Sequence, residues 1–90
     1  MTIEFTRRGW EDLEYWLDND PKISLKIRTL LKVIARTPFA GEGKPEALKH
    51  DLKGFWSRRL SLEHRMVYHI SGKTGDNHKC VVLQCRFHYD

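Results

Sequence analysis

The sequence predicts an α+β fold in which an N-terminal strand and a helical hairpin pack on an antiparallel β-sheet. Apolar residues recur at helical spacing over the first 36 residues, whereas apolar and polar residues alternate with the two-residue period of strands from Phe55 onward. The loop-rich stretch 37–46, which holds two prolines and two glycines, separates these halves. A chain of 90 residues with 40% hydrophobic content can build a modest core, so we expect residues 1–90 to form a single domain.

The first elements are expected to be a short strand and a helix. Residues 2–6 (TIEFT) alternate and are rich in β-branched and aromatic side chains, which favour a strand. Thr6 is a suitable N-cap for a helix over residues 7–19, because its hydroxyl can accept a hydrogen bond from the first helical turn. The apolar stripe expected on this helix consists of Trp10, Leu13 and Leu17, flanked by Trp16.

A second helix is expected to follow almost immediately. Asp20 suits the N-cap and Pro21 suits the first helical position, where its fixed φ is compatible with the helix. The apolar face of this helix carries Ile23, Ile27, Leu30, Leu31 and Ile34. The short connection between the two helices predicts an antiparallel helical hairpin.

The second half of the chain is expected to be an antiparallel meander. Residues 55–61, 63–71 and 80–89 have strand-like patterns, and the glycine-containing stretch 71–79 is typical of a hairpin turn. Helices should cover one face of this sheet. Alternation assigns to that core face Trp56, Leu60 and Leu62, then Met66, Tyr68 and Ile70, then Leu83, Cys85 and Phe87.

The opposite face of the same strands is expected to be rich in cations. Its predicted members are Ser57, Arg59 and Ser61, then Arg65 and Val67, then Gln84, Arg86 and His88. A solvated sheet face is the simpler interpretation, since arginine is ordinary there. Arginines together with a histidine are, however, the groups that bind phosphate and transfer protons.

Composition and cysteine spacing restrict the class of protein. A net charge of +4 favours a polyanionic or acidic partner, either nucleic acid or protein. No apolar run is long enough to span a membrane, and we expect a cytoplasmic protein. Cys80 and Cys85 are an odd number of positions apart, so on one regular strand they would face opposite sides and could not pair. The sequence has no Cys-x-x-Cys or His-x-x-x-His pair, and no metal or other cofactor is expected.

The cation-rich face could support cleavage of RNA without a metal ion. Attack of a 2′-hydroxyl on the adjacent phosphate needs a base for the hydroxyl proton, cations for the phosphorane charge and an acid for the 5′ oxygen. Candidates for these roles are, in order, Glu46 with Lys49 nearby, Arg59 with Arg65, and His88. Tyr89 could stack on a base. Each residue also has an ordinary explanation as a solvated loop carboxylate, part of a surface charge patch or an incidental terminal histidine.

Two stretches of the chain resemble one family of bacterial toxins. RTPFAGEGKPEALKHDLKGFWSRRLSLEHRMVYHI, which covers residues 36–70, and the terminal CRFHY resemble the Txe/YoeB family within the RelE-like superfamily. The likeness extends over nearly the whole chain. It implies the RelE/YoeB-like microbial RNase fold. It also implies an mRNA interferase that cleaves translated message in the ribosomal A site without a metal ion and thereby inhibits translation.

The resemblance also implies a role for each candidate residue. It makes Glu46 the general base, His88 the general acid and Arg65 the group that stabilises the phosphate. The implied substrate-binding residues are Lys49, Arg59 and Tyr89, with Arg86 as a further candidate. The chain continues past the usual HY end with Asp90, and we expect carboxylates near His88 to favour its protonated form.

The family likeness implies partners as well. These are a YefM-like antitoxin that wraps the toxin and blocks its site, the 70S ribosome with its mRNA, and operator DNA bound through the antitoxin, with no membrane partner. A homodimer of the free toxin is also implied. Two alternatives without cleavage stay open, a ParE-like toxin that acts on DNA gyrase and a small basic RNA-binding module. The presence of both Glu46 and His88 favours the endoribonuclease.

Overall fold

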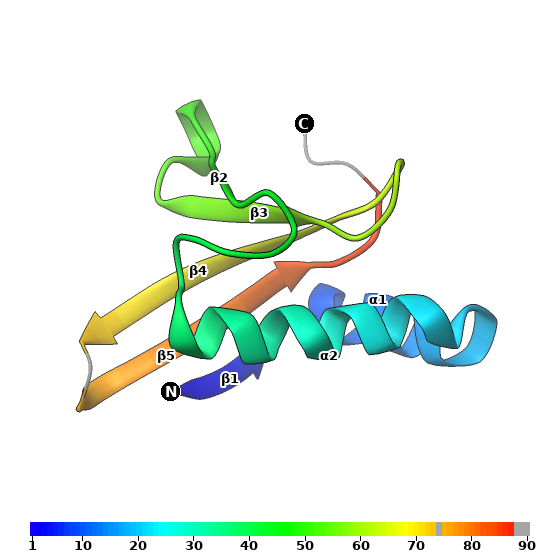
Figure 1. Ribbon diagram of the computed structural model, residues 1–90, viewed down its shortest axis with the longest axis horizontal. Coiled ribbons are helices and arrows are strands. Elements are labelled where there is room, and N and C mark those ends of the chain that lie inside the picture. Colours follow the sequence, from blue (N-terminus) through cyan, green and yellow to red (C-terminus); the bar gives the residue numbers. More distant parts are fainter. Residues whose placement is uncertain (74, 88–90) are drawn as a thin grey trace.

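The computed structural model describes residues 1–73 and 75–87, and its elements confirm the α+β architecture. In chain order they are β1 (Thr2–Phe5), α1 (Arg7–Asn19), α2 (Pro21–Arg36), β2 (Glu46–Ala47), the 3₁₀ turn η1 (His50–Leu52), β3 (Phe55–Arg59), β4 (Arg65–Lys73) and β5 (Asp76–Gln84). Figure 1 shows both helices lying along one face of the sheet. The N-terminal strand and the helical hairpin are therefore present as predicted.

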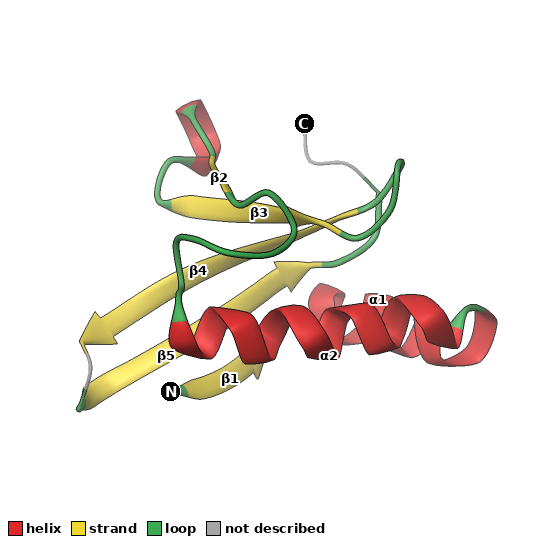
Figure 2. Cartoon of the chain, viewed as in Figure 1, coloured by secondary structure: helices red, strands yellow, loops and turns green. Residues whose placement is uncertain are grey.

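The strands form one mixed sheet in the order β1-β5-β4-β3-β2 (Figure 2). Strands β2 to β5 pair antiparallel, as expected for a meander, while β1 pairs in parallel with β5. A long connection that contains both helices separates β1 from the other strands, so no hairpin dictates its direction. The predicted antiparallel sheet thus gains one short parallel strand at its edge.

Helix α1 begins at the predicted N-cap. The Thr6 hydroxyl accepts a 3.0 Å hydrogen bond from the Gly9 N–H and donates one of 2.7 Å to the carbonyl oxygen of Leu83. The cap therefore also joins the helix to β5. Gly9 is buried at this junction, where an added Cβ would lie 2.5 Å from the Val82 carbonyl oxygen. Only a residue without a side chain lets α1 approach β5 so closely.

The core-facing side of α1 differs from the predicted stripe. Trp16 is 6% exposed and belongs to the core, whereas Trp10 is 50% and Leu17 is 53% exposed, and Leu13 is half-buried. The side of α1 that contacts the core is therefore rotated about the helix axis relative to the predicted apolar stripe. The close approach at Gly9 selects the side of the helix that faces the sheet, and Trp16, about two turns later, lies on that side.

Helix α2 packs as its sequence predicts. Asp20 occupies the N-cap position without a side-chain hydrogen bond, and Pro21 is the first helical residue. The core residues of α2 are Ile27, Leu30 and Ile34, with Ile23 and Leu31 partly buried beside them. Each fully buried side chain of this size contributes about 1.5–3 kcal/mol to folding. In the described part of the chain, neither helix is long and apolar enough to cross a membrane.

Most of the predicted core positions of β3 and β4 are correct. The residues that contact the core as predicted are Trp56, Leu60, Met66, Tyr68 and Ile70. Leu62 is instead 90% exposed, because β3 ends at Arg59 and Leu62 lies in the turn before β4. The prediction that Leu62 is a core residue is therefore wrong.

A β-bulge in β5 changes which of its residues face the helices. Tyr68 pairs with Val82, but the preceding residue Val67 pairs with Gln84, so Leu83 is an extra residue in β5. The alternation of side chains shifts by one residue at this point. Val82 therefore lies in the core and Gln84 faces the other way, although they are two positions apart. Leu83 itself is half-buried at the bulge and does not belong to the core cluster, so the prediction that it is a core residue is wrong.

The bulge overturns the prediction that the two cysteines face opposite sides of the sheet. Cys80 and Cys85 are both completely buried in the same core cluster, and Cys85 is there as predicted. Both are free thiols, and burial away from water raises the pKa of each thiol to about 12. Their common face follows from the extra residue at Leu83, which alternation alone does not reveal.

The last hairpin and the last strand also differ from their predicted lengths. Strand β4 runs to Lys73 and β5 starts at Asp76, so most of the predicted turn 71–79 is strand. Strand β5 ends at Gln84, well before residue 89. Phe87 has a φ of 66° and is 51% exposed, so its predicted core position is wrong. Its left-handed backbone is incompatible with a continuing strand.

Candidate active site

A row of four residues crosses the sheet on the face opposite the helices. Glu46 of β2 pairs with Ser57 of β3, Ser57 pairs with Val67 of β4, and Val67 pairs with Gln84 of β5. Paired residues of an antiparallel sheet project from the same face, with Cβ atoms about 4.5–5.5 Å apart. Both sequence neighbours of Val67 belong to the core, so this row faces away from the helices. The β-bulge is what places Gln84 on it.

Two arginines lie beside this row. Arg59 and Arg65 are paired with each other on β3 and β4, each two residues along its strand from a member of the row. They therefore share the face of the row. Arg65 Nε donates a 3.0 Å hydrogen bond to Ser57 Oγ, and Ser57 is completely buried. Ser57 thus orients the Arg65 guanidinium on the face that carries Glu46.

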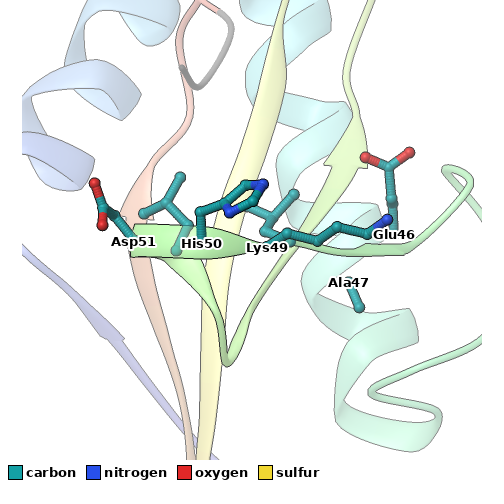
Figure 3. Close-up of a pocket in the computed structure, with 7 residues that line it drawn as sticks. Glu46, Ala47, Lys49, His50 and Asp51 are labelled. Atoms are coloured by element: carbon teal, nitrogen blue, oxygen red, sulfur yellow. The ribbon is translucent and has the colours of Figure 1, made fainter.

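Residues 46–52, which begin with the strand β2 that pairs with β3, line a cavity of about 590 Å³. The segment is anchored at Leu48, which is buried and whose N–H donates a 2.9 Å hydrogen bond to the Phe55 carbonyl oxygen. Figure 3 shows the Lys49 side chain extending toward Glu46, with Asp51 at the other end of the segment. The cavity therefore presents a carboxylate and an ammonium group from neighbouring positions.

The loop that leads to Glu46 is held by Arg58. This arginine is completely buried, so it does not belong to the surface charge patch that its position beside Arg59 suggests. Its guanidinium donates hydrogen bonds of 2.7, 2.8 and 2.8 Å to the carbonyl oxygens of Glu42, Thr37 and Ala40, respectively. The loop backbone is thereby fixed against β3 shortly before the segment that carries Glu46.

Arg86 packs against α1. Strand β5 has ended at Gln84, and the Arg86 guanidinium lies 3.4 Å from the centroid of the Tyr15 ring. The predicted position of Arg86 on the cation-rich sheet face is therefore wrong. The physical reason is that residues beyond the end of a strand no longer follow its alternation.

Two predicted site residues, His88 and Tyr89, lie outside the described residues, as does Asp90, the residue expected to favour the protonated form of His88. The described chain leads to them through Phe87, whose carbonyl oxygen accepts a 3.1 Å hydrogen bond from the Arg65 N–H. His88 therefore follows, in sequence, a residue that is bound to the backbone of Arg65.

Two residues contribute to the site although the sequence alone assigns them no role there. Ser57 orients Arg65, and His64 Nδ1 accepts a 2.7 Å hydrogen bond from the Phe87 N–H. Strand alternation places Ser57 on the correct face, but it does not indicate a bond to Arg65. His64 lies in the turn between β3 and β4, and no local pattern connects it with a residue 23 positions later.

The described face combines the carboxylate of Glu46 with the cations of Arg59 and Arg65, and the Lys49 side chain extends toward Glu46 from the segment after β2 (Figure 3). Like charges that are directly opposite each other in a sheet repel, so the arginine pair favours an anion between them. Guanidinium groups match the oxygens of a phosphate, and a carboxylate can accept a proton. Among residues 1–73 and 75–87, no group of three or more His, Cys, Asp or Glu side chains could hold a metal ion. The arrangement suits proton abstraction next to a bound phosphodiester.

Comparison with known proteins points to one family. Residues 5–89 match the family model of the YoeB-like toxin of bacterial type II toxin–antitoxin systems. The toxin YoeB of Streptomyces coelicolor is 48% identical over 89 residues, which cover 99% of this chain and 100% of that protein.

Solved structures of related toxins resemble this chain in both fold and sequence. A YoeB/ParE toxin from Agrobacterium tumefaciens is 47% identical with a TM-score of 0.93, over 99% of this chain and 100% of that one. YoeB from Staphylococcus aureus, solved as a dimer, is 40% identical with a TM-score of 0.87, over 99% and 98% of the two chains. A heterotetrameric YoeB–YefM toxin–antitoxin complex from the same organism matches at 40% identity with a TM-score of 0.85 and equal coverage.

Proposed function

Because this chain belongs to the YoeB-like toxins of bacterial type II toxin–antitoxin systems, we propose that it is a ribosome-dependent endoribonuclease that cleaves translated mRNA in the ribosomal A site. The register that puts Glu46 on the same sheet face as Arg59 and Arg65 is the observation that supports this most directly. RNA cleavage by its own 2′-hydroxyl needs such a base beside such a phosphate-binding pair. The result of cleavage is inhibition of translation.

In the proposed reaction, Glu46 takes the proton of a 2′-hydroxyl, whose oxygen attacks the adjacent phosphorus. Arg65, oriented by Ser57, stabilises the negative charge of the pentacoordinate phosphorane together with Arg59. His88 donates a proton to the 5′ oxygen as its bond to phosphorus breaks. The products are a 2′,3′-cyclic phosphate and a 5′-hydroxyl end, and the reaction needs no metal ion.

The proposed substrate contacts extend beyond the reacting phosphate. Lys49, on the segment of Glu46, binds the RNA backbone as a cation. Tyr89 contacts the substrate near the cut, where an aromatic ring can stack on a base. In this proposal Arg86 holds the segment after β5 against α1 by stacking on Tyr15, and it does not contact the substrate.

We propose a YefM-like antitoxin as the partner that neutralises the toxin. The Staphylococcus aureus YoeB–YefM complex supports this, because that YoeB is 40% identical over almost the whole of both chains. The antitoxin covers the cation-rich face and blocks access to it, and the complex binds operator DNA through the antitoxin. The dimer of the Staphylococcus aureus toxin supports a homodimer for the free protein. The toxin acts in the cytoplasm, where it meets ribosomes and mRNA.

Mapping of mRNA 5′ ends in a bacterial translation extract tests the proposed activity. The wild-type protein is expected to cut a translated message within its reading frame and to leave 5′-hydroxyl ends. Glu46→Gln and His88→Ala are each expected to lower cutting by about 100-fold or more, because general acid–base catalysis contributes about 10²–10⁴. Glu14→Gln removes the same charge from an exposed position on α1 and should cut like wild type.

Two results would contradict the proposal. One is cutting that persists unchanged in Glu46→Gln, and the other is cutting of a message that cannot be translated. Inhibition of DNA gyrase without cleavage of message would instead indicate the ParE-like alternative.

A further inference from the structure

Residues 85–87 follow the end of β5 and are held by side chains of other elements. The Cys85 N–H donates a 3.0 Å hydrogen bond to Asp12 Oδ2, and the Cys85 carbonyl oxygen accepts one of 2.7 Å from Trp16 Nε1. Both Asp12 and Trp16 belong to α1. The first residue beyond the sheet is therefore fixed by the helix that packs on it.

Phe87, the last described residue, is bound at both of its backbone polar groups. Its N–H donates a 2.7 Å hydrogen bond to His64 Nδ1, and its carbonyl oxygen accepts one of 3.1 Å from the Arg65 N–H. The φ of 66° at Phe87 lies in the left-handed region that a phenylalanine rarely adopts. The two hydrogen bonds thus hold a backbone conformation that is unfavourable by itself.

His64 is itself fixed in position. Its N–H donates a 3.2 Å hydrogen bond to Ser61 Oγ, and its carbonyl oxygen accepts bonds of 2.9 and 3.2 Å from the N–H groups of Leu60 and Ser61. Its ring meets the Trp16 ring edge-on, with 4.7 Å between the centroids, and lies 5.6 Å from the Phe87 ring. The turn and α1 therefore determine the direction of Nδ1.

The hydrogen bond indicates which tautomer the His64 ring adopts. A backbone N–H donates to Nδ1, so Nδ1 carries no proton and the neutral imidazole has its hydrogen on Nε2. An asparagine at this position would offer its Oδ1 as an acceptor near the place of Nδ1. A phenylalanine would keep a ring of similar shape without any acceptor. The two substitutions therefore separate the hydrogen bond from the packing.

We infer that His64 is a positioning residue for the proposed cleavage, acting through Phe87 on the general acid that follows in the chain. The inference rests on the proposed function. The hydrogen bonds of Phe87 fix the residue that immediately precedes His88 in the sequence, and they fix it relative to the backbone of Arg65. A proton donor must be placed accurately against the leaving oxygen, and a displacement of about 1 Å can lower a rate about 100-fold. His64 does not itself contact the substrate.

Kinetics of two His64 variants on programmed ribosomes test this inference. His64→Phe keeps the ring that packs on Trp16 and removes the acceptor, and we expect kcat to fall about 10- to 100-fold with KM nearly unchanged. His64→Asn keeps an acceptor and is expected to retain most of the wild-type kcat. Ile34→Val, a change in the core of α2, lowers stability without touching the terminal segment and should retain the wild-type kcat.

Amide hydrogen exchange provides a readout that does not depend on catalysis. The Phe87 N–H is expected to exchange faster in His64→Phe than in the wild type or in His64→Asn. A wild-type kcat in His64→Phe, or equal losses in both His64 variants, would overturn the inference. Failure of the wild-type protein to cut message would overturn the proposed function, while the exchange rates would still report on the hydrogen bond.

A second experiment leaves His64 unchanged and covers the case in which His64→Phe does not fold. Ligation at Cys85 can join residues 1–84 to a synthetic terminal peptide in which an ester replaces the amide between Arg86 and Phe87. This change removes the N–H that binds Nδ1 and should lower kcat as His64→Phe does. An ester protein with the kcat of an all-amide ligated control would refute the role of His64.

Discussion

Arg58 Nε donates a 3.0 Å hydrogen bond to the hydroxyl of Tyr68, and both side chains are completely buried. The Tyr68 hydroxyl in turn donates one of 2.7 Å to the Pro38 carbonyl oxygen. Burial raises the pKa of Tyr68, so its hydroxyl keeps the proton that it donates. Since Arg58 also binds four carbonyl oxygens of the same loop, the pair ties residues 37–42 to strands β3 and β4. The loop that leads to Glu46 is built around a buried cation.

Arg58→Lys is predicted to destabilise the fold although it keeps the charge. A lysine ammonium is a compact group at the end of a flexible chain, and it cannot reach the phenol and the loop carbonyls together. Each hydrogen bond from the buried guanidinium contributes about 1.5–3 kcal/mol, and the substitution removes more than one of them, so we expect a loss of at least about 2 kcal/mol. Urea denaturation measures this loss, with Arg59→Lys at the neighbouring exposed position as the control. Equal, small effects of both substitutions would contradict the role assigned to Arg58.

Gly9→Ala is predicted to destabilise the protein even though alanine is the better helix former. The new Cβ would lie 2.5 Å from the Val82 carbonyl oxygen, so α1 would have to move away from β5. Overpacking of this kind costs about 1–3 kcal/mol. Thermal denaturation alongside Glu14→Ala, a change at an exposed position of the same helix, provides the comparison. A rise in Tm for Gly9→Ala would mean that the contact between α1 and β5 can accommodate a Cβ at position 9.

The boundaries of the helices could be predicted almost to the residue, because they depend on local chemistry. Thr6, Asp20 and Pro21 mark the two starts, and α1 and α2 begin where these residues indicate. The side of α1 that faces the sheet could not be predicted. It depends on the contact between Gly9 and Val82, which are far apart in the sequence.

The candidate site could be predicted as far as strand alternation holds. Arg59 and Arg65 share the expected face because the ladder between β3 and β4 is regular. Alternation fails at Leu83, where the bulge puts Cys80 and Cys85 on one side of the sheet. A bulge depends on packing across the whole sheet, and the sequence around Leu83 carries no local mark of it.

The two cysteines are predicted to be unreactive in the folded protein. Burial raises the pKa of both thiols to about 12, so near pH 8 very little of the reactive thiolate is present. A disulfide reagent should therefore label Cys80 and Cys85 only after denaturation. Rapid labelling of the native protein would show that the core opens around them, and a urea-denatured sample gives the reference for complete reaction.

The same pKa shifts predict a loss of stability at alkaline pH. Below the ordinary thiol pKa of 9.0, both groups keep their protons in the folded and unfolded states, and the stability does not change. Above it, the unfolded chain releases protons that the folded chain retains, so the free energy of unfolding falls until the buried thiols titrate near pH 12. Urea denaturation on either side of this ordinary pKa measures the decline. A double variant, Cys80→Ala with Cys85→Ala, should decline less; an equal decline would assign the effect to other groups.

Ser57→Ala is predicted to lower the cleavage rate more than it lowers stability. The substitution removes the Oγ that accepts a 3.0 Å hydrogen bond from Arg65 Nε, so the guanidinium is held less firmly for the phosphate. A hydrogen bond to a charged group contributes about 1.5–3 kcal/mol, and half of that in the transition state would lower kcat about 4- to 12-fold. Ser71→Ala is the matched control, because the buried Ser71 Oγ has no hydrogen-bond partner among the described residues. If both variants cut programmed ribosomes at the wild-type rate, Ser57 does not orient Arg65 for its proposed role in binding the phosphate.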